Sequence, residues 1–258
     1  MKGMTELPLF YAPEIGITGQ LPEPEAMHCG RVLRKQVGDQ ILITDGHGKV
    51  HVATIVSLKR QECMVSIDQT TIWSRNWNGP IVIAIAPTKN LDRMEWMVEK
   101  LVEIGIDGIV FLKTEHSERK TVKPERIERV MISAMKQSLK AVLPALEVDV
   151  PFIDFVKRPL TFNSGLIAHC VDDASLPLRE IPASILPPGS GATILIGPEG
   201  DFSLKEIELA VNLGYHGITL GDSRLRAETA GIVACQWVHT LQQIEKQKDK
   251  THNIINHL

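Results

Sequence analysis

Hydrophobic positions follow a short period in the first part of the chain. Residues 40–44 and 49–58 alternate or run apolar, and residues 62–71 form another segment of this kind. The turn formers between the first two segments are typical of a β-hairpin: Asp45, Gly46, His47 and Gly48. Short strands with tight turns and little helical periodicity predict a small β-barrel over residues 1–72.

The period changes after residue 80, beyond an irregular segment that predicts a domain boundary. Continuous apolar runs predict buried strands at residues 81–86, 109–112, 166–170, 193–196 and 218–220. Helical spacing predicts helices over residues 91–104, 124–142, 203–213 and 227–246. Ser203 and Glu206 have the spacing of a capping box. This alternation predicts an α/β domain over residues 73–258, with a mostly parallel sheet covered on both faces.

The composition is that of an ordinary globular protein. Hydrophobic residues make up 43% and charged residues 23%, and no run approaches the roughly 20 apolar residues of a membrane span. The four cysteines lie far apart and the histidines lack metal-ligand spacing. We therefore expect no disulfide framework, no metal, no membrane partner and a cytoplasmic location. The net charge of −3 does not by itself predict a nucleic-acid partner.

Two predicted strand-to-helix turns are candidate ligand-binding segments. The first lies between a buried strand and the helix capped by Ser203, and it contains Leu195, Ile196, Gly197, Pro198, Glu199, Gly200 and Asp201. Ligands of open α/β sheets bind at the carboxyl ends of strands, where glycines allow a close approach to the backbone. A plain strand-to-helix turn is the better explanation of this segment when it is taken alone.

The second turn precedes the final predicted helix and contains Leu220, Gly221, Asp222, Ser223, Arg224, Leu225, Arg226, Ala227, Glu228, Thr229 and Ala230. Glu228 suits the first turn of a helix, but the cation of Arg226 opposes the helix dipole there. A residue that is locally unfavourable, with no evident compensating gain in stability, indicates a functional site. Because the two turns follow successive predicted parallel strands, we expect them to line one pocket.

Taken together, the two turns closely resemble the RsmE family of SPOUT RNA methyltransferases. The resemblance covers nearly the whole chain, in the right order. Further residues that carry it are His28, Arg31, Val32, Leu33, Arg34, Gly38, Asp39, Asp45, Gly46, Arg93, Met94, Glu95, Lys100, Glu103, Gly105, Ser117, Glu118, Arg119, Gln137, Ser138 and Pro144. The sequence departs from the family at Asp201, where a glycine is usual, and at Lys136 and Lys140, where Glu and Arg are usual.

The resemblance implies both a fold and an activity. The fold is a PUA-like β-barrel followed by a SPOUT domain with a C-terminal trefoil knot, assembled as a homodimer. The activity is methylation of uridine N3 in 16S ribosomal RNA of the small subunit, with S-adenosyl-L-methionine (SAM) as cofactor. The expected SAM-binding residues are Leu195, Ile196, Gly197, Pro198, Glu199, Gly200, Leu220, Gly221, Leu225 and Thr229.

Chemistry at uridine N3 suggests roles for the charged residues. Arg226 is expected to stabilise charge that develops on the uracil oxygens. Glu228 is expected to accept the N3 proton, or alternatively to orient Arg226. The expected RNA-binding residues are His28, Arg31, Arg34, Arg93, Arg119 and Lys140, whose phosphate contacts supply affinity but little sequence information. His169, at a predicted strand end, is expected near the cofactor.

Two other functions stay open on the sequence alone. One is a non-enzymatic RNA-binding or ribosome-assembly factor on the same fold, against which Arg226 and Glu228 together argue. The other is a SPOUT enzyme that acts on transfer RNA or on another ribosomal nucleotide. A phosphate-handling enzyme is disfavoured, because the sequence has neither a phosphate-binding loop nor an acidic metal cluster.

Overall fold

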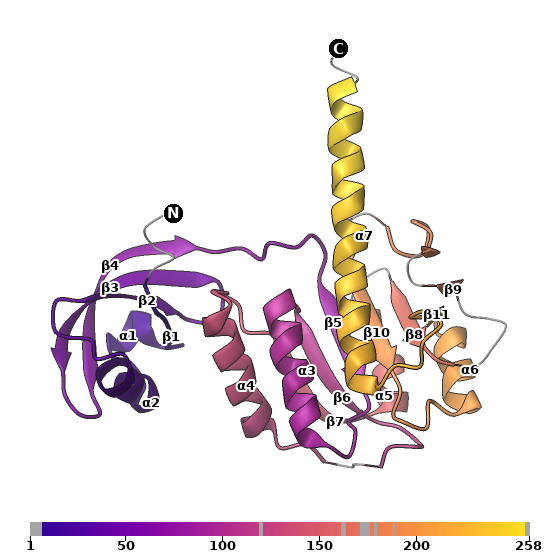
Figure 1. Cartoon of the computed structure of the whole chain (residues 1–258), viewed down its shortest axis with the longest axis horizontal. Helices are drawn as coiled ribbons and strands as arrows, with labels where there is room; N and C mark the ends of the chain where they lie inside the picture. The colour runs from indigo at the N-terminus through magenta and orange to yellow at the C-terminus, as the bar shows by residue number, and fades with distance from the viewer. Residues whose placement is uncertain are drawn as a thin grey trace. The chain divides into compact units, whose positions relative to one another are not determined.

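The computed structural model in Figure 1 describes residues 7–118, 121–160, 164–170, 176–177, 180–187 and 189–255, with side chains as far as residue 244. Its contacts divide the chain into two compact units. The first unit comprises Met1–Asn76 and Met131–Leu143, and the second comprises Trp77–Val130 and Pro144–Leu258. The hydrophobic pattern of the sequence did not predict that residues 131–143 belong to the first unit.

The first unit contains a four-stranded sheet among its described residues. Its strands lie in the order β1 (Leu9–Tyr11), β2 (Gln40–Thr44), β3 (Lys49–Leu58) and β4 (Cys63–Ile72). The predicted hairpin is confirmed as the antiparallel pair of β2 and β3. The sequence missed three short helical segments, α1 (Ile15–Thr18), α2 (Glu23–Met27) and the π-helix η1 (His28–Val32). Each is too short to show a helical period.

A hydrogen-bonded connection holds the second segment of the first unit. Helix α4 (Pro124–Gln137) ends earlier than the predicted residue 142, and Leu139 has a φ of 51° just beyond it. The hydroxyl of Thr44 and the N–H of Gly48 both donate to the carbonyl of Ala141, over 2.9 Å each. The chain therefore leaves the helix in order to pair with the β2–β3 hairpin.

The second unit is built on a seven-stranded sheet, as far as its residues are described. The order is β7 (Ala145–Pro151), β6 (Gly108–Lys113), β5 (Ile81–Ile85), β10 (Ala192–Ile196), β8 (Gly165–Ala168), β11 (Tyr215–Thr219) and β9 (Leu176–Pro177). Every pair is parallel, which confirms the predicted sheet. The sequence missed β7, a half-exposed edge strand without a continuous apolar run.

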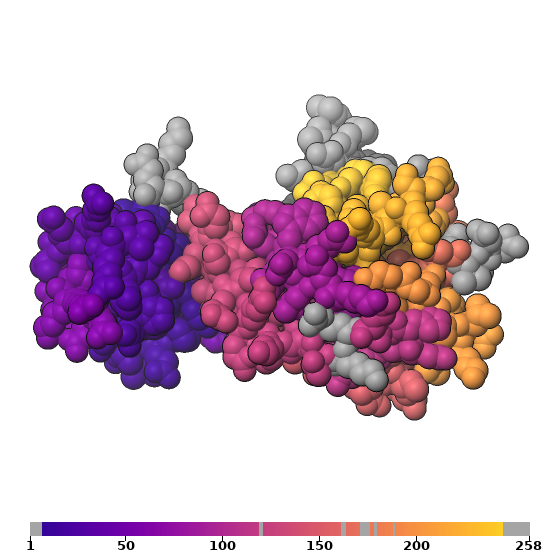
Figure 2. Space-filling view, turned by 60° about the horizontal axis from the view of Figure 1, so that its bottom comes forward, coloured from indigo at the N-terminus to yellow at the C-terminus, as the bar shows by residue number. Residues whose placement is uncertain are grey.

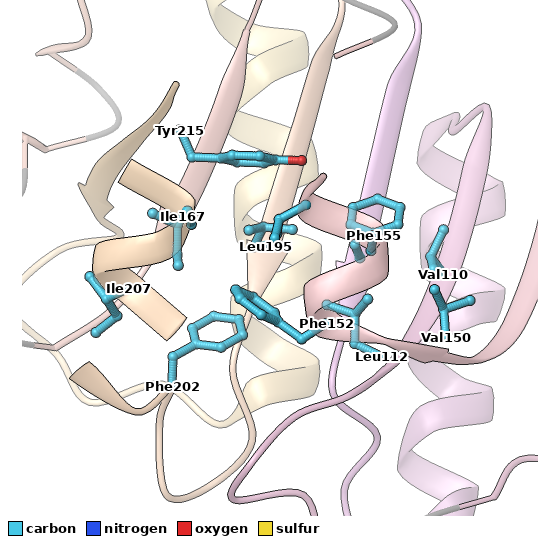
Figure 3. Close-up of a cluster of buried hydrophobic side chains, with 13 residues drawn as sticks. Val110, Leu112, Val150, Phe152, Phe155, Ile167, Leu195, Phe202, Ile207 and Tyr215 are labelled. Atoms are coloured by element: carbon cyan, nitrogen blue, oxygen red, sulfur yellow. The ribbon is translucent and has the colours of Figure 1, made fainter. Parts of the chain in front are cut away.

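Helices cover both faces of this sheet. On one face, α3 (Leu91–Ile104) and α7 (Ala227–Ile255) lie side by side (Figure 1). On the other face, Phe152 of α5 (Phe152–Val156) and Ile207 of α6 (Leu204–Asn212) pack over Leu195 and Ile167 of the sheet (Figure 3). The apolar strands are thus buried on both sides, as their sequence predicted.

Gly105 joins the end of α3 to α7. Its φ is 122°, and a Cβ at this position would lie 2.8 Å from the ring of Trp77. The Gly105 carbonyl accepts a hydrogen bond from Nε2 of His239 on α7, over 2.7 Å. Only glycine fits this conformation and this close approach. The contact fixes the position of α7, whose first turn carries Glu228.

Candidate functional site

The carboxyl ends of β8, β10 and β11 surround a pocket of about 1260 Å³, here called the carboxyl-edge pocket. Its wall consists of residues 168–170, 196–201 and 218–227, together with Ala230. Figure 2 shows the orange surface of the segments before α7 beside the yellow surface of α7. The two turns singled out in the sequence therefore line one pocket. They do not follow neighbouring strands, however, because β8 lies between β10 and β11 and adds its own end to the wall.

A tight turn forms the first wall segment. The N–H of Asp201 donates to the carbonyl of Pro198 over 3.0 Å. A Cβ at Gly197 would lie 3.0 Å from the backbone nitrogen of Phe202 and 3.2 Å from the Asp201 carboxylate. The turn ends at the predicted capping box of α6, where the Glu206 carboxylate accepts from the N–H of Ser203 over 2.9 Å. A capped helix thus follows a turn that leaves little room for a side chain at Gly197.

Most of the residues expected to bind the cofactor lie on the pocket wall: Ile196, Gly197, Pro198, Glu199, Gly200, Leu220, Gly221 and Leu225. Leu195 and Thr229 do not. The side chain of Leu195 is fully buried in the core between the sheet and α5 and α6, because alternate residues of a strand point to opposite faces. Thr229 lies half-buried in the first turn of α7.

Arg226 and Glu228 are placed differently. Arg226 lies on the pocket wall and is exposed, and its carbonyl accepts from the N–H of Ala230 at the start of α7, over 2.8 Å. Glu228 is only 5% exposed and is absent from the wall. Its Oε1 lies 3.7 Å from Nη1 of Arg93 on α3. The geometry therefore joins Glu228 to Arg93, a pairing that the sequence did not predict.

His169 lies on the pocket wall at the end of β8, near the place where the sequence predicted a cofactor. Only 8% of its surface is exposed. Burial lowers the pKa of His169 below its ordinary value, and the nearby Asp201 carboxylate opposes part of this effect. The imidazole is therefore neutral at neutral pH.

This lowered pKa predicts how the stability of the chain depends on pH. Below the unfolded-state pKa of about 6.5, His169 binds a proton more readily in the unfolded chain than in the folded chain. His169 therefore lowers the free energy of unfolding as the pH falls through this range, and has no such effect above it. The free energy of unfolding of the wild type should therefore fall between about pH 7.5 and about pH 5.5. We expect this decrease, measured by urea unfolding, to be smaller in His169→Gln. An unchanged decrease would contradict the prediction.

The residues expected to bind RNA are distributed over both units. His28 and Arg31 belong to the π-helix η1 and Arg34 follows it, and all three are exposed. Lys140 lies beyond α4 in the second segment of the first unit, and its N–H donates to the carbonyl of Met135. Arg93 belongs to the second unit. Arg119 lies outside the described residues.

A second cavity, of about 250 Å³, lies at the opposite edge of the sheet and is here called the amino-edge cavity. Phe155, Arg158 and Tyr215 are among its lining residues, and burial raises the pKa of Tyr215 to about 12. Its volume is below the range of about 300–1,000 Å³ that is typical of ligand pockets. Ligands of open sheets also bind at the carboxyl edge, so the larger pocket is the better candidate.

Two negative findings apply to the described part of the chain. No group of three or more His, Cys, Asp or Glu side chains there is arranged to hold a metal ion. None of the helices within it has the length and apolar character needed to cross a membrane.

Comparison with known families decides the identity of the fold. Residues 75–239 match the model of an RNA methyltransferase domain, and this range includes the entire wall of the carboxyl-edge pocket. The chain belongs to the RNA methyltransferase family. Residues 21–68 of this methyltransferase match an RNA methyltransferase PUA domain, so a PUA-like domain forms most of the described sheet of the first unit.

Individual relatives agree with this family. A probable rRNA-methyltransferase of Porphyromonas gingivalis is 48% identical, with a TM-score of 0.87, over 93% of this chain and 100% of that protein. The small subunit methyltransferase E of Neisseria gonorrhoeae, solved bound to S-adenosyl methionine, is 27% identical with a TM-score of 0.79, over 91% of this chain and 98% of that one. The ribosomal RNA small subunit methyltransferase E of Synechocystis sp. is 29% identical over 90% of this chain and 77% of that relative.

Proposed function

We propose that this methyltransferase transfers a methyl group from SAM to N3 of a uridine in 16S ribosomal RNA of the small subunit. The observation that carries the proposal is the carboxyl-edge pocket, because both family-like turns line it. Relatives that cover nearly the whole chain bear the name of a small subunit methyltransferase, and one was solved with the cofactor bound. The uridine and its N3 atom come from the sequence resemblance.

The pocket fits SAM in size and in chemistry. Its volume of about 1260 Å³ exceeds the usual range of ligand pockets, and leaves room for a nucleotide beside the cofactor. Leu220 and Leu225 supply apolar surface for an adenine ring, while Gly197, which has no side chain, lets a ligand approach the backbone of the turn. Glu199 and Asp222 place negative charge on the wall, which suits the ammonium and sulfonium groups of SAM.

Arg226 supplies the positive charge that the transfer requires. When bound, SAM would supply the methyl group and leave as S-adenosylhomocysteine, and uridine N3 becomes nucleophilic only after its proton has passed to a water molecule. The negative charge then spreads to the uracil oxygens. Arg226 directly precedes α7 and its carbonyl accepts from the N–H of Ala230, and its exposed guanidinium is the group on the wall that we assign to stabilise this charge.

Glu228 is better placed to hold Arg93 than to accept the N3 proton. The carboxylate is buried away from the pocket wall, and it lies in the first turn of α7. Its contact with Arg93 keeps a second cation on α3 fixed. We therefore assign Glu228 a positioning role that is exerted through Arg93.

The first unit is proposed to bind RNA. The π-helix η1 presents Arg31, and Arg34 follows with a left-handed φ of 53° that a side chain of this kind rarely adopts. Both π-helices and strained residues are concentrated at functional sites. Lys140 adds a further cation in the same unit. Such residues contact phosphates and supply affinity that weakens with salt.

Three finer features are part of the proposal. The trefoil knot is supported by the strand order, because β10 and β11 follow one another along the chain but flank β8 in the sheet. The homodimer rests on the sequence resemblance. A cytoplasmic location follows from a ribosomal RNA substrate.

A substitution in the first turn tests the donor site. Gly197→Ala places a Cβ 3.0 Å from a backbone nitrogen, so the turn must shift. We expect the affinity for SAM, measured by calorimetry, to fall about tenfold, the equivalent of roughly 1.4 kcal/mol. Gly16→Ala is the control, because a Cβ there meets nothing within 4 Å. Equal affinities for the two variants would contradict the assignment of this wall.

Nucleoside analysis tests the proposed substrate. Small subunits that lack the modification, large subunits and transfer RNA are incubated separately with the protein and labelled SAM. We expect 3-methyluridine in the small-subunit RNA. Methylation confined to transfer RNA or to large subunits would overturn the proposed substrate but not the activity. Label in none of these RNAs, including free 16S RNA, would indicate a non-enzymatic RNA-binding factor.

A further inference from the structure

Three loops of the second unit meet at Asp201. The N–H of Cys170, after β8, donates to Oδ2 of Asp201 over 2.8 Å. The N–H of Phe202 donates to Oδ1 over 2.7 Å. The Asp201 carbonyl lies 3.0 Å from Nδ1 of His116, after β6, and because a carbonyl only accepts, this nitrogen carries the proton. Asp201 thus connects the loops that follow β6, β8 and β10.

The backbone of Asp201 shows that these contacts are needed. Its φ of 62° lies in the left-handed region, where glycine is favoured and where Asp is strained less than most other residues. Such a conformation persists only where surrounding contacts hold it. A glycine would satisfy the turn without strain but would offer no carboxylate. The turn geometry therefore does not explain the side chain, whereas its two hydrogen bonds do.

Two of the three connected loops form part of the pocket wall. His169 and Cys170 on one side and residues 196–201 on the other all line the pocket. His116 supports the wall from behind, since a Cβ at Gly200 would lie 3.5 Å from the His116 side chain. The Asp201 carboxylate therefore bridges two parts of the wall, and its carbonyl ties them to a third loop.

We propose that Asp201 is a positioning residue for the methyl donor, which in this chain holds the β8 and β10 loops in the arrangement that binds SAM. This inference rests on the proposed function. Asp201 acts through the backbone of Cys170 and Phe202, so its effect is on the affinity for the donor. The rate at saturating donor depends on other residues.

Substitution should give a graded response. An ionised Asp accepts from both N–H groups, Asn has a single acceptor oxygen, and Gly has none. Hydrogen bonds to an ionised group are about twice as strong as neutral ones. We therefore expect Asp201→Asn to raise the dissociation constant and the KM for SAM about tenfold, and Asp201→Gly to raise them further, with kcat changed less than about twofold.

Asp149 offers a matched control in the same unit. It too has a left-handed φ, of 59°, and its Oδ1 accepts from the N–H of Val122 over 3.3 Å. It is not part of the pocket wall. Asp149→Asn should lower the midpoint of unfolding but leave the KM for SAM unchanged. A purely structural role of Asp201 would give the same result as this control.

The test combines calorimetry, steady-state kinetics and hydrogen exchange on the full chain. We expect weaker SAM binding by Asp201→Asn, a higher KM, and faster exchange of the Cys170 amide. If the wild type binds SAM and Asp201→Asn binds it equally well, the positioning role is overturned and the proposed function stands. If the wild type binds no SAM, the proposed function falls together with this inference. Should the Gly variant fail to fold, the Asn variant decides.

Discussion

Arg226→Ala is expected to lower the rate of methyl transfer about 10²–10³-fold, the usual effect of removing one donor that stabilises developing negative charge. Arg226 is exposed on the pocket wall, so truncation should leave the fold intact. The loss should appear in kcat, with the affinity for SAM within about threefold of the wild type, because this interaction develops in the transition state. Labelled-SAM transfer under saturating conditions measures it.

Arg158→Ala is the control for this prediction. Arg158 is also an exposed arginine of the second unit, but it pairs with Glu147 over 2.9 Å at the amino-edge cavity. We expect a rate close to that of the wild type. If both variants lose activity equally, or if Arg226→Ala retains full activity, Arg226 does not have the proposed role.

Glu228→Gln is expected to lower the rate by about one to two orders of magnitude, because a displacement of about 1 Å in a catalytic group can cost 10²-fold. The substitution preserves shape but removes the charge that holds Arg93 at 3.7 Å. If Glu228 acts through Arg93, the double variant with Arg93→Ala should lose no more activity than Arg93→Ala alone.

The pH profile separates this role from proton acceptance. A general base contributes about 10²–10⁴-fold, and its loss removes the acidic limb of the dependence of kcat on pH. Our assignment predicts that Glu228→Gln keeps the limb. If the activity losses of Glu228→Gln and Arg93→Ala were additive in the double variant, and if Glu228→Gln removed the acidic limb, Glu228 would be the proton acceptor instead.

The elements that could be predicted from the sequence are those in which the apolar pattern extends over enough residues for its period to be recognised. The strand before Gly197 is buried throughout, and the helix that ends at Gly105 buries one apolar face, so the period was visible in both. Strand β7 is half-exposed and the helices of the first unit are only four or five residues long, so neither had a readable period. The return of Met131–Leu143 to the first unit depends on long-range pairing, which a local pattern does not contain.

The candidate site divides in the same way. Both turns were found because glycines and an oddly placed arginine interrupt regular elements at Gly197, Gly221 and Arg226. The Arg93–Glu228 pair and the bridge from Asp201 to Cys170 join residues far apart in sequence. A single sequence does not show such tertiary contacts. The sequence showed that Asp201 departs from the family pattern, but it did not indicate which residue the carboxylate contacts.

Hydrogen–deuterium exchange with and without SAM shows whether the carboxyl-edge pocket binds the cofactor. We expect slower exchange in residues 197–202 and 218–226 and at Cys170, with little change around Phe155 and Tyr215. Protection confined to the amino-edge cavity around Phe155 and Tyr215, or no protection at saturating SAM, would contradict this expectation.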